Sequence, residues 1–156
     1  MYWTPLKFGK HKGKTLPQVM FSDPDWFFHI WDEGGFDENS NYHNQAKVIY
    51  AKATSICIPQ NKQEMRKVEY NLLDGKSVGF DLVPVSRPQH RGATQTILSD
   101  HIDMSFPHSV RKYDKLGYKL FLRSLKFYFF GNKSLRMTRK HCEEFFNDET
   151  NFHNND

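Results

Sequence analysis

Residues 65–85 read MRKVEYNLLDGKSVGFDLVPV and carry the clearest structural signal in this chain. Two runs rich in valine, leucine and aromatic residues, 65–73 and 78–85, flank the pair Asp74-Gly75. An Asp-Gly pair between such runs is typical of a tight β-hairpin, because both residues tolerate the positive φ angles of the turn. The stretch therefore predicts two antiparallel strands.

Helical patterns precede this hairpin. Asp23 followed by Pro24 is a typical helix start, with aspartate as the cap and proline at the first helical position. It predicts a helix over residues 25–33. Apolar residues recur at helical spacing from residue 45 to 56 and predict a second helix. Nearer the N-terminus, residues 6–16 read as two short extended pieces joined by a glycine-bearing turn, which predicts a first hairpin.

Helices are also expected after the central hairpin. Residues 87–92 are rich in glycine, proline and basic residues and predict a loop. A helix is predicted from Ser105 to about residue 130, although residues 125–129 also alternate as a strand would. Thr138 is a candidate cap for a helix over residues 139–146.

These patterns predict an α+β fold with an N-terminal β-hairpin plus two helices and a C-terminal half that holds a second β-hairpin and basic aromatic helices. The expected division is a module over residues 1–58, a hinge at 59–63 and a basic half over 62–147. The polar, asparagine-rich residues 148–156 predict a disordered tail.

Composition narrows the class of protein. A chain of 156 residues, 38% hydrophobic and 15% aromatic, is sufficient for one packed domain. No leader sequence or long apolar run is evident, so we expect a soluble cytoplasmic protein without membrane contact. Cys57 and Cys142 lack the paired spacing of a zinc site and are expected to be reduced thiols. We expect no metal and no cofactor.

The net charge of +4 is unevenly distributed. Residues 87–140 hold twelve Lys or Arg against three Asp, which leaves this segment near +9. The first twenty residues add four lysines and no acid. Such asymmetry favours a basic face that concentrates a polyanion.

The sequence FGKHKGKTL of residues 8–16 is the most basic turn. A Walker phosphate-binding loop needs four residues between its glycines, but only three separate Gly9 from Gly13. A nucleotide-hydrolysing site is therefore excluded here. The glycines suit a turn, from which the lysines would project as mobile charges toward phosphates.

Residues 8–16, followed by DPDW at 23–26 and by Trp31, resemble a small domain that is appended to exodeoxyribonuclease X and also occurs alone or in fusions in bacteria and phages. The resemblance covers residues 6–33, or up to 58 if the second helix belongs to it. It implies a hairpin-and-helix module associated with DNA-processing enzymes and without known catalysis. No exonuclease sequence precedes it here, so nuclease activity is not expected to carry over.

The main prediction is non-catalytic, sequence-independent binding of DNA or RNA by an accessory protein of bacterial or phage replication, repair or recombination. The expected contact residues are Lys10, His11, Lys12, Lys14, Arg87, Arg91, Arg111, Lys112, Arg123 and Lys126. Between residues 111 and 128, the aromatics Tyr113, Tyr118, Phe121, Phe127 and Tyr128 could stack on unpaired bases. Their spacing also allows burial in the core, which is the favoured interpretation because Leu116, Leu120, Leu122 and Leu125 need burial in any case.

Two alternatives remain open from the sequence. A small phage-encoded factor that binds a host enzyme would use exposed aromatic and acidic residues, the candidates being Tyr2, Trp3, Trp31, Asp32, Glu33, Asp37 and Glu38. A metal-dependent nuclease would use Asp81, His101 and Asp103, with His90 and His108 nearby, because carboxylate and imidazole ligands suit divalent metals.

Overall fold

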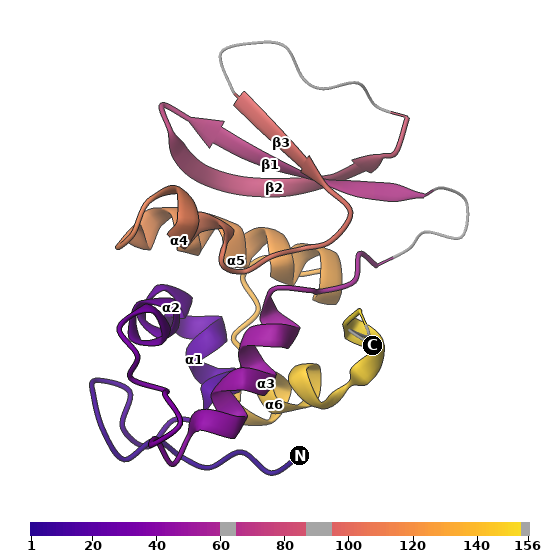
Figure 1. Ribbon diagram of the computed structural model, residues 1–156. Helices are drawn as coiled ribbons and strands as arrows, with labels where there is room; N and C mark the ends of the chain where they lie inside the picture. Colours follow the sequence, from indigo (N-terminus) through magenta and orange to yellow (C-terminus); the bar gives the residue numbers. More distant parts are fainter. Residues whose placement is uncertain (60–64, 87–94, 154–156) are drawn as a thin grey trace.

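The computed structural model describes residues 1–59, 65–86 and 95–153 (Figure 1). These residues form helices and one three-stranded antiparallel sheet, which confirms the predicted α+β class. In chain order the elements are α1 (Leu16–Ser22), α2 (Pro24–Asp32), α3 (His43–Ala53), β1 (Arg66–Leu73), β2 (Lys76–Pro84), β3 (Gln95–Ser99), α4 (Phe106–Val110), α5 (Lys115–Phe130), α6 (Arg139–Asn147) and the 3₁₀-helix η1 (Glu149–Asn151). The predicted loop at 87–92, and all but the first residue of the predicted hinge at 59–63, lie outside the described residues.

The central hairpin forms as predicted. β1 and β2 pair antiparallel around Asp74 and Gly75, whose φ angles are 51° and 74°. β3 pairs with the other edge of β1, so the strand order is β2-β1-β3. The sequence analysis did not predict β3, because its five residues are too few to show a clear period.

β2 carries a bulge where it meets α5. Val78 and Gly79 together stand opposite the single residue Asn71 of β1. Gly79 has a φ of 98°, which glycine adopts readily, and such bulges bend a strand. The Ser124 hydroxyl of α5 accepts a hydrogen bond from the Phe80 backbone N–H at 3.2 Å. The bulge thus brings the backbone of β2 close to α5.

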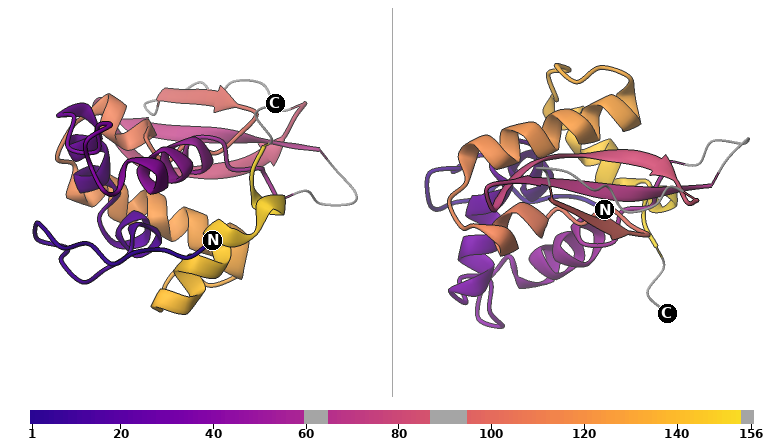
Figure 2. Two further views of the ribbon diagram at one scale, coloured as in Figure 1. Left: turned by 60° about the horizontal axis from the view of Figure 1, so that its bottom comes forward. Right: turned by 90° about the horizontal axis from the view of Figure 1, so that it is seen from above.

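The helices lie in layers on one side of the sheet. α4 and α5 lie between the sheet and the remaining helices (Figure 1), and α5 packs against β2. Figure 2 shows this arrangement from two further directions. α6 packs against α1. α6, the last α-helix of the described residues, therefore joins the N-terminal helices, away from the sheet.

One cluster of buried side chains runs through the molecule. It includes residues of α1, α2, α3, the sheet, α5 and α6. Aromatic rings make up much of it, and Phe27, Phe80, Phe121 and Phe146 are almost completely buried. The predicted segments 1–58 and 62–147 thus contribute to the same core.

Residues 6–14 form a closed loop, so the predicted pair of N-terminal strands is wrong. Within residues 1–59 no strand is present. The Leu6 N–H donates to the Lys14 carbonyl at 2.9 Å, and the Gly13 N–H donates to the Leu6 carbonyl at 2.8 Å. Gly9 and Gly13 have φ angles of 75° and 89°. With left-handed residues at two positions, the chain curls back instead of continuing an extended ladder.

α1 was not predicted, although its signal is present in the sequence. Thr15 is the N-cap, and the Gln18 side chain three residues later accepts a hydrogen bond from the Thr15 N–H at 2.9 Å. Pro17 lies in the first turn, where its missing N–H has no cost. Threonine followed by glutamine at this spacing is the capping-box pattern. The N-terminal half therefore has three helices where two were expected.

The long helix predicted over residues 105–130 is two helices, α4 and α5. Tyr113 has a φ of 62°, which no helix interior accepts. The Asp114 carboxylate then accepts the Gly117 N–H at 2.8 Å and caps a new helix. α5 is continuous through residues 125–129, so the strand-like alternation there belongs to a helix.

The prediction of a disordered tail is wrong for residues 148–153. Phe152 is buried, and its ring stacks on that of Phe146 with centroids 5.6 Å apart. The Cys57 N–H donates to the Asn151 carbonyl at 2.8 Å, and the His153 N–H donates to the Ser55 carbonyl at 3.0 Å. A single phenylalanine in a polar stretch thus anchors it by burial. Residues 154–156 lie outside the described chain.

Candidate nucleic-acid interface

A groove of about 730 Å³ runs between the N-terminal loop and α5. We call it the basic groove, because seven of its lining side chains are cationic and two are acidic. The lining residues are Lys10, His11, Lys14, Ser22, Asp23, Pro24, Asp25, Lys115, Tyr118, Lys119, Leu122, Arg123, Lys126, Lys133 and Ser134. With His11 neutral, the sum of seven positive and two negative charges is +5.

One wall of the basic groove is the loop over residues 6–14, which is fixed to the start of α2. The Asp23 carboxylate accepts hydrogen bonds from Lys10 Nζ at 2.8 Å and from His11 Nε2 at 2.9 Å. It also caps α2 by accepting the Trp26 N–H. Gly9 lies against the Trp26 ring, where an added Cβ would come within 3.1 Å. The loop is therefore held rigidly enough to form a wall.

These contacts lower the pKa of Asp23. Burial alone would raise the pKa of its carboxyl group, but the hydrogen bonds from Lys10 and His11 outweigh burial. The pKa of Asp23 is consequently below its ordinary value of 3.8. This carboxylate stays ionised at neutral pH, and its contacts with Lys10 and His11 hold the loop.

The other wall is one face of α5. Lys115, Lys119 and Arg123 follow each other at four-residue spacing, and Lys126 comes three residues later. Residues at these spacings lie on the same side of a helix. The opposite side of α5 carries the buried residues Phe121 and Leu125 and faces the core.

Most cations of the basic groove have no ionic partner in the part of the chain that the structure describes. Apart from Lys10, they form no ion pair with any carboxylate of the described residues; they are Lys14, Lys115, Lys119, Arg123, Lys126 and Lys133. The second acid of the groove, Asp25, is engaged by His108 and by the Tyr113 N–H. The groove thus holds an excess of positive charge that no described acid compensates.

The structure brings together half of the predicted contact residues. Lys10, His11, Lys14, Arg123 and Lys126 line the basic groove. Lys12, Arg111 and Lys112 are exposed but do not line it, and Lys112 lies 3.7 Å from Asp32. His11 is mostly buried, with its Nε2 bonded to Asp23, so it positions the loop. Arg87 and Arg91 lie outside the described residues.

Sequence reasoning missed three cations of the basic groove: Lys115, Lys119 and Lys133. The first two could have been found from their spacing to Arg123, had the start of the helix been placed at Asp114. Lys133 follows the end of α5 at Gly131, and only the path of the chain brings it to the groove.

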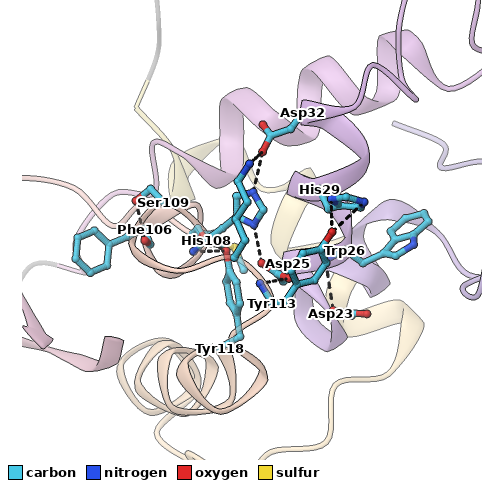
Figure 3. A network of polar contacts seen from close by, with 12 residues as sticks. Asp23, Asp25, Trp26, His29, Asp32, Phe106, His108, Ser109, Tyr113 and Tyr118 are labelled. Atoms are coloured by element: carbon cyan, nitrogen blue, oxygen red, sulfur yellow. Dashed lines mark hydrogen bonds and ion pairs between the residues drawn. The ribbon is translucent and has the colours of Figure 1, made fainter. Parts of the chain in front are cut away.

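A buried histidine joins α2 to α4 beside the groove (Figure 3). His108 Nδ1 lies 2.6 Å from Asp25 Oδ1, and its Nε2 lies 2.8 Å from Asp32 Oδ2. Each ring nitrogen therefore faces a carboxylate oxygen of α2. Neither nitrogen is left to take a proton from a substrate. His108 therefore acts as a structural bridge and not as a general base.

The residues of the metal-nuclease hypothesis do not converge. Asp81 accepts from the Asn71 side chain, His101 pairs with Asp100, and Asp103 accepts from Ser105. Among the described residues no group of three histidine, cysteine or acidic side chains could hold a metal ion. His90 lies outside this part of the chain. The described residues thus give this hypothesis no support.

The residues of the protein-interface hypothesis are only partly exposed. Trp3 is 1% exposed, and its Nε1 donates to Asn147 at 2.9 Å, so its selection as a surface residue was wrong. Its ring belongs to the buried core. Trp31 stacks on Tyr50, with ring centroids 4.4 Å apart, and Asp32 is bonded to His108. Exposed residues are Tyr2, Asp32, Glu33, Asp37 and Glu38.

Both cysteines are free thiols. Burial raises the pKa of Cys142 to about 12 and also raises that of Cys57. A raised pKa keeps the thiol protonated at neutral pH, and the protonated thiol is a poor nucleophile. Neither cysteine therefore has the character of a catalytic residue.

No helix of the described residues is both long enough and apolar enough to cross a membrane. No protein-family model, curated protein or solved structure matches this chain. The resemblance of residues 6–33 to the domain appended to exodeoxyribonuclease X therefore stays a prediction.

Proposed function

We propose that this protein binds nucleic acid, without catalysis, through the basic groove. The observation that supports this most is the convergence of seven cations from the N-terminal loop, α5 and the following turn, six of them unpaired with any described acid. Like charges held together destabilise a fold, and a bound polyanion would relieve that repulsion. A role beside DNA-processing enzymes rests on the resemblance of residues 6–33 and belongs to the same proposal.

The length of the basic groove favours a polymer over a single small anion. From Lys115 to Lys126 the helix rises about 16 Å, at roughly 1.5 Å per residue. Successive phosphates of one strand in a duplex are spaced at about 3.4 Å along the axis, so several would meet this row.

The experiment is fluorescence anisotropy with labelled single-stranded DNA, duplex DNA and RNA. The groove variant carries Lys119→Gln, Arg123→Gln and Lys126→Gln, all on the groove side of α5. The control variant carries Lys7→Gln, Lys47→Gln and Lys76→Gln, three exposed lysines that do not line the groove. Each variant loses three positive charges, so the two have the same net charge and differ only in where the charges are removed.

We expect the groove variant to bind about tenfold or more weakly than the control variant, because phosphate contacts dominate such affinities. Far-ultraviolet circular dichroism should give the same spectrum for both. Equal affinities of the two variants would contradict the proposal, since general charge attraction would then explain the binding. Absence of binding of any polymer by the unaltered protein at low salt would also contradict it.

A further inference from the structure

We infer that the basic groove takes a single strand and that an unpaired base of this strand stacks on Phe127; this rests on the proposed function. A second hollow, of about 230 Å³, opens beside the basic groove where α5 meets the bulge of β2. Arg123 and Lys133 line both spaces. A polymer in the groove would therefore have this hollow next to it.

Phe127 is the exposed aromatic of this hollow. Its side chain is 52% exposed, although Phe80 and Phe121 nearby are buried. It lies one helical turn after Arg123, so the ring and the guanidinium are neighbours on α5. A cation beside an open aromatic face is the arrangement with which proteins hold single strands, the cation near phosphate and the ring against a base.

The structure also separates the aromatic residues that the sequence left ambiguous. Tyr118 and Phe121 are buried, and Tyr128 is half-buried with its ring stacked on Phe80 at 5.9 Å. These three serve the core. Tyr113 is 67% exposed, but it lines neither space and its hydroxyl is bonded to His29. Of these five aromatics, Phe127 is the one that is exposed and lines the hollow, which makes it the residue available for stacking.

The charge of the hollow suits a base better than a phosphate. Asp81 lines the hollow, and its carboxylate would repel a phosphate. The same carboxylate can accept a hydrogen bond from the amino group of a cytosine, as acidic side chains do in base recognition. Phosphates in the basic groove would pair with its cations, and a base in the hollow would pair with the Asp81 carboxylate. A duplex cannot provide this, because its base faces are stacked on one another.

The test compares three labelled ligands of equal length: a single-stranded DNA, an abasic deoxyribose-phosphate strand and a duplex. Phe127→Ala removes the ring. Leu116→Ala is the matched control, since Leu116 is exposed on the same helix and lines neither space. Phe127→Trp keeps an aromatic face, and thermal unfolding checks that each variant keeps its fold.

We expect Phe127→Ala to lose about 5- to 150-fold in affinity for the single strand, as one lost stacking contact predicts. Its affinity for the abasic strand should stay unchanged, and Phe127→Trp and Leu116→Ala should bind the single strand as the unaltered protein does. If Phe127→Ala binds the single strand normally, or the duplex binds as tightly as the single strand, this inference fails while the groove proposal stands. If none of the three ligands binds, both fail.

Discussion

At the scale of single residues, Asp23 links the basic loop to the helical core. One carboxylate caps α2 and holds both Lys10 and His11. Its pKa is lowered, so its ionised form is more stable in the folded protein than in the unfolded chain. Sequence reasoning assigned the cap but not the ionic contacts, because the distance from Lys10 to Asp23 in space depends on how the loop closes.

The sign of the pH dependence follows from this lowered pKa. Stability from Asp23 is fully present above its unfolded pKa near 3.8 and is lost as pH falls through the lower folded value. We expect the unfolding free energy of the unaltered protein to fall more steeply below about pH 4 than that of Asp23→Asn. Asparagine retains the cap, so this variant isolates the charge.

Chemical denaturation at a series of pH values measures the effect. Glu38→Gln is the control, because Glu38 is an exposed acid away from the groove. Its pH curve should run parallel to that of the unaltered protein. If the Asp23→Asn curve is parallel as well, the ionic role of Asp23 is contradicted.

At the scale of elements, α5 organises the site because it has three distinct sides. One faces the core through Phe121, one lines the basic groove through Lys119, and one exposes Phe127. β2 approaches this helix through its bulge at Gly79. An added Cβ there would lie 3.0 Å from Ser124 Oγ and 3.5 Å from the Leu120 carbonyl oxygen.

Gly79→Ala should therefore destabilise the protein, both through its positive φ and through the contact with α5. We expect a loss of about 1–3 kcal/mol in unfolding free energy by urea denaturation. Gly131→Ala is the matched comparison, since Gly131 has a φ of 70° with open space around it. Its loss should be smaller. An equal loss for both would show that the close approach of β2 and α5 contributes nothing.

The elements that could be predicted are those whose signals are local. Asp74-Gly75 specifies a turn by itself, and Thr138 caps α6 by accepting the His141 N–H at 3.2 Å. The break between α4 and α5 depends on the positive φ of Tyr113. A tyrosine in the sequence does not predict a positive φ, so this break could not be predicted. The basic groove was only half predicted, because it joins residues that are more than 100 positions apart.

At the scale of the whole molecule, the end of the chain completes the core. Phe152 packs against Phe145 and Phe146, and it pairs with Ile56 in an isolated bridge. Trp3 Nε1 meanwhile donates to Asn147 of α6. The first and last parts of the described chain are thus held together, which composition alone could not reveal.

Phe152→Ala should be strongly destabilising, because it removes a buried ring from a packed aromatic cluster. We expect a loss of about 3 kcal/mol or more in the free energy of unfolding. Tyr2→Ala is the control, since Tyr2 is 79% exposed and should change stability little. Equal stability of the Phe152→Ala and unaltered proteins would contradict the packed tail.

The most direct test of the basic groove is the salt dependence of single-stranded DNA binding by the groove and control variants. Each phosphate contact contributes about 0.7 to the slope of log affinity against log salt. If three contacts are made by Lys119, Arg123 and Lys126, the groove variant should have a slope about 2 smaller in magnitude than the unaltered protein. The control variant should keep the full slope. An unchanged slope for the groove variant would contradict the claim that this side of α5 holds phosphates.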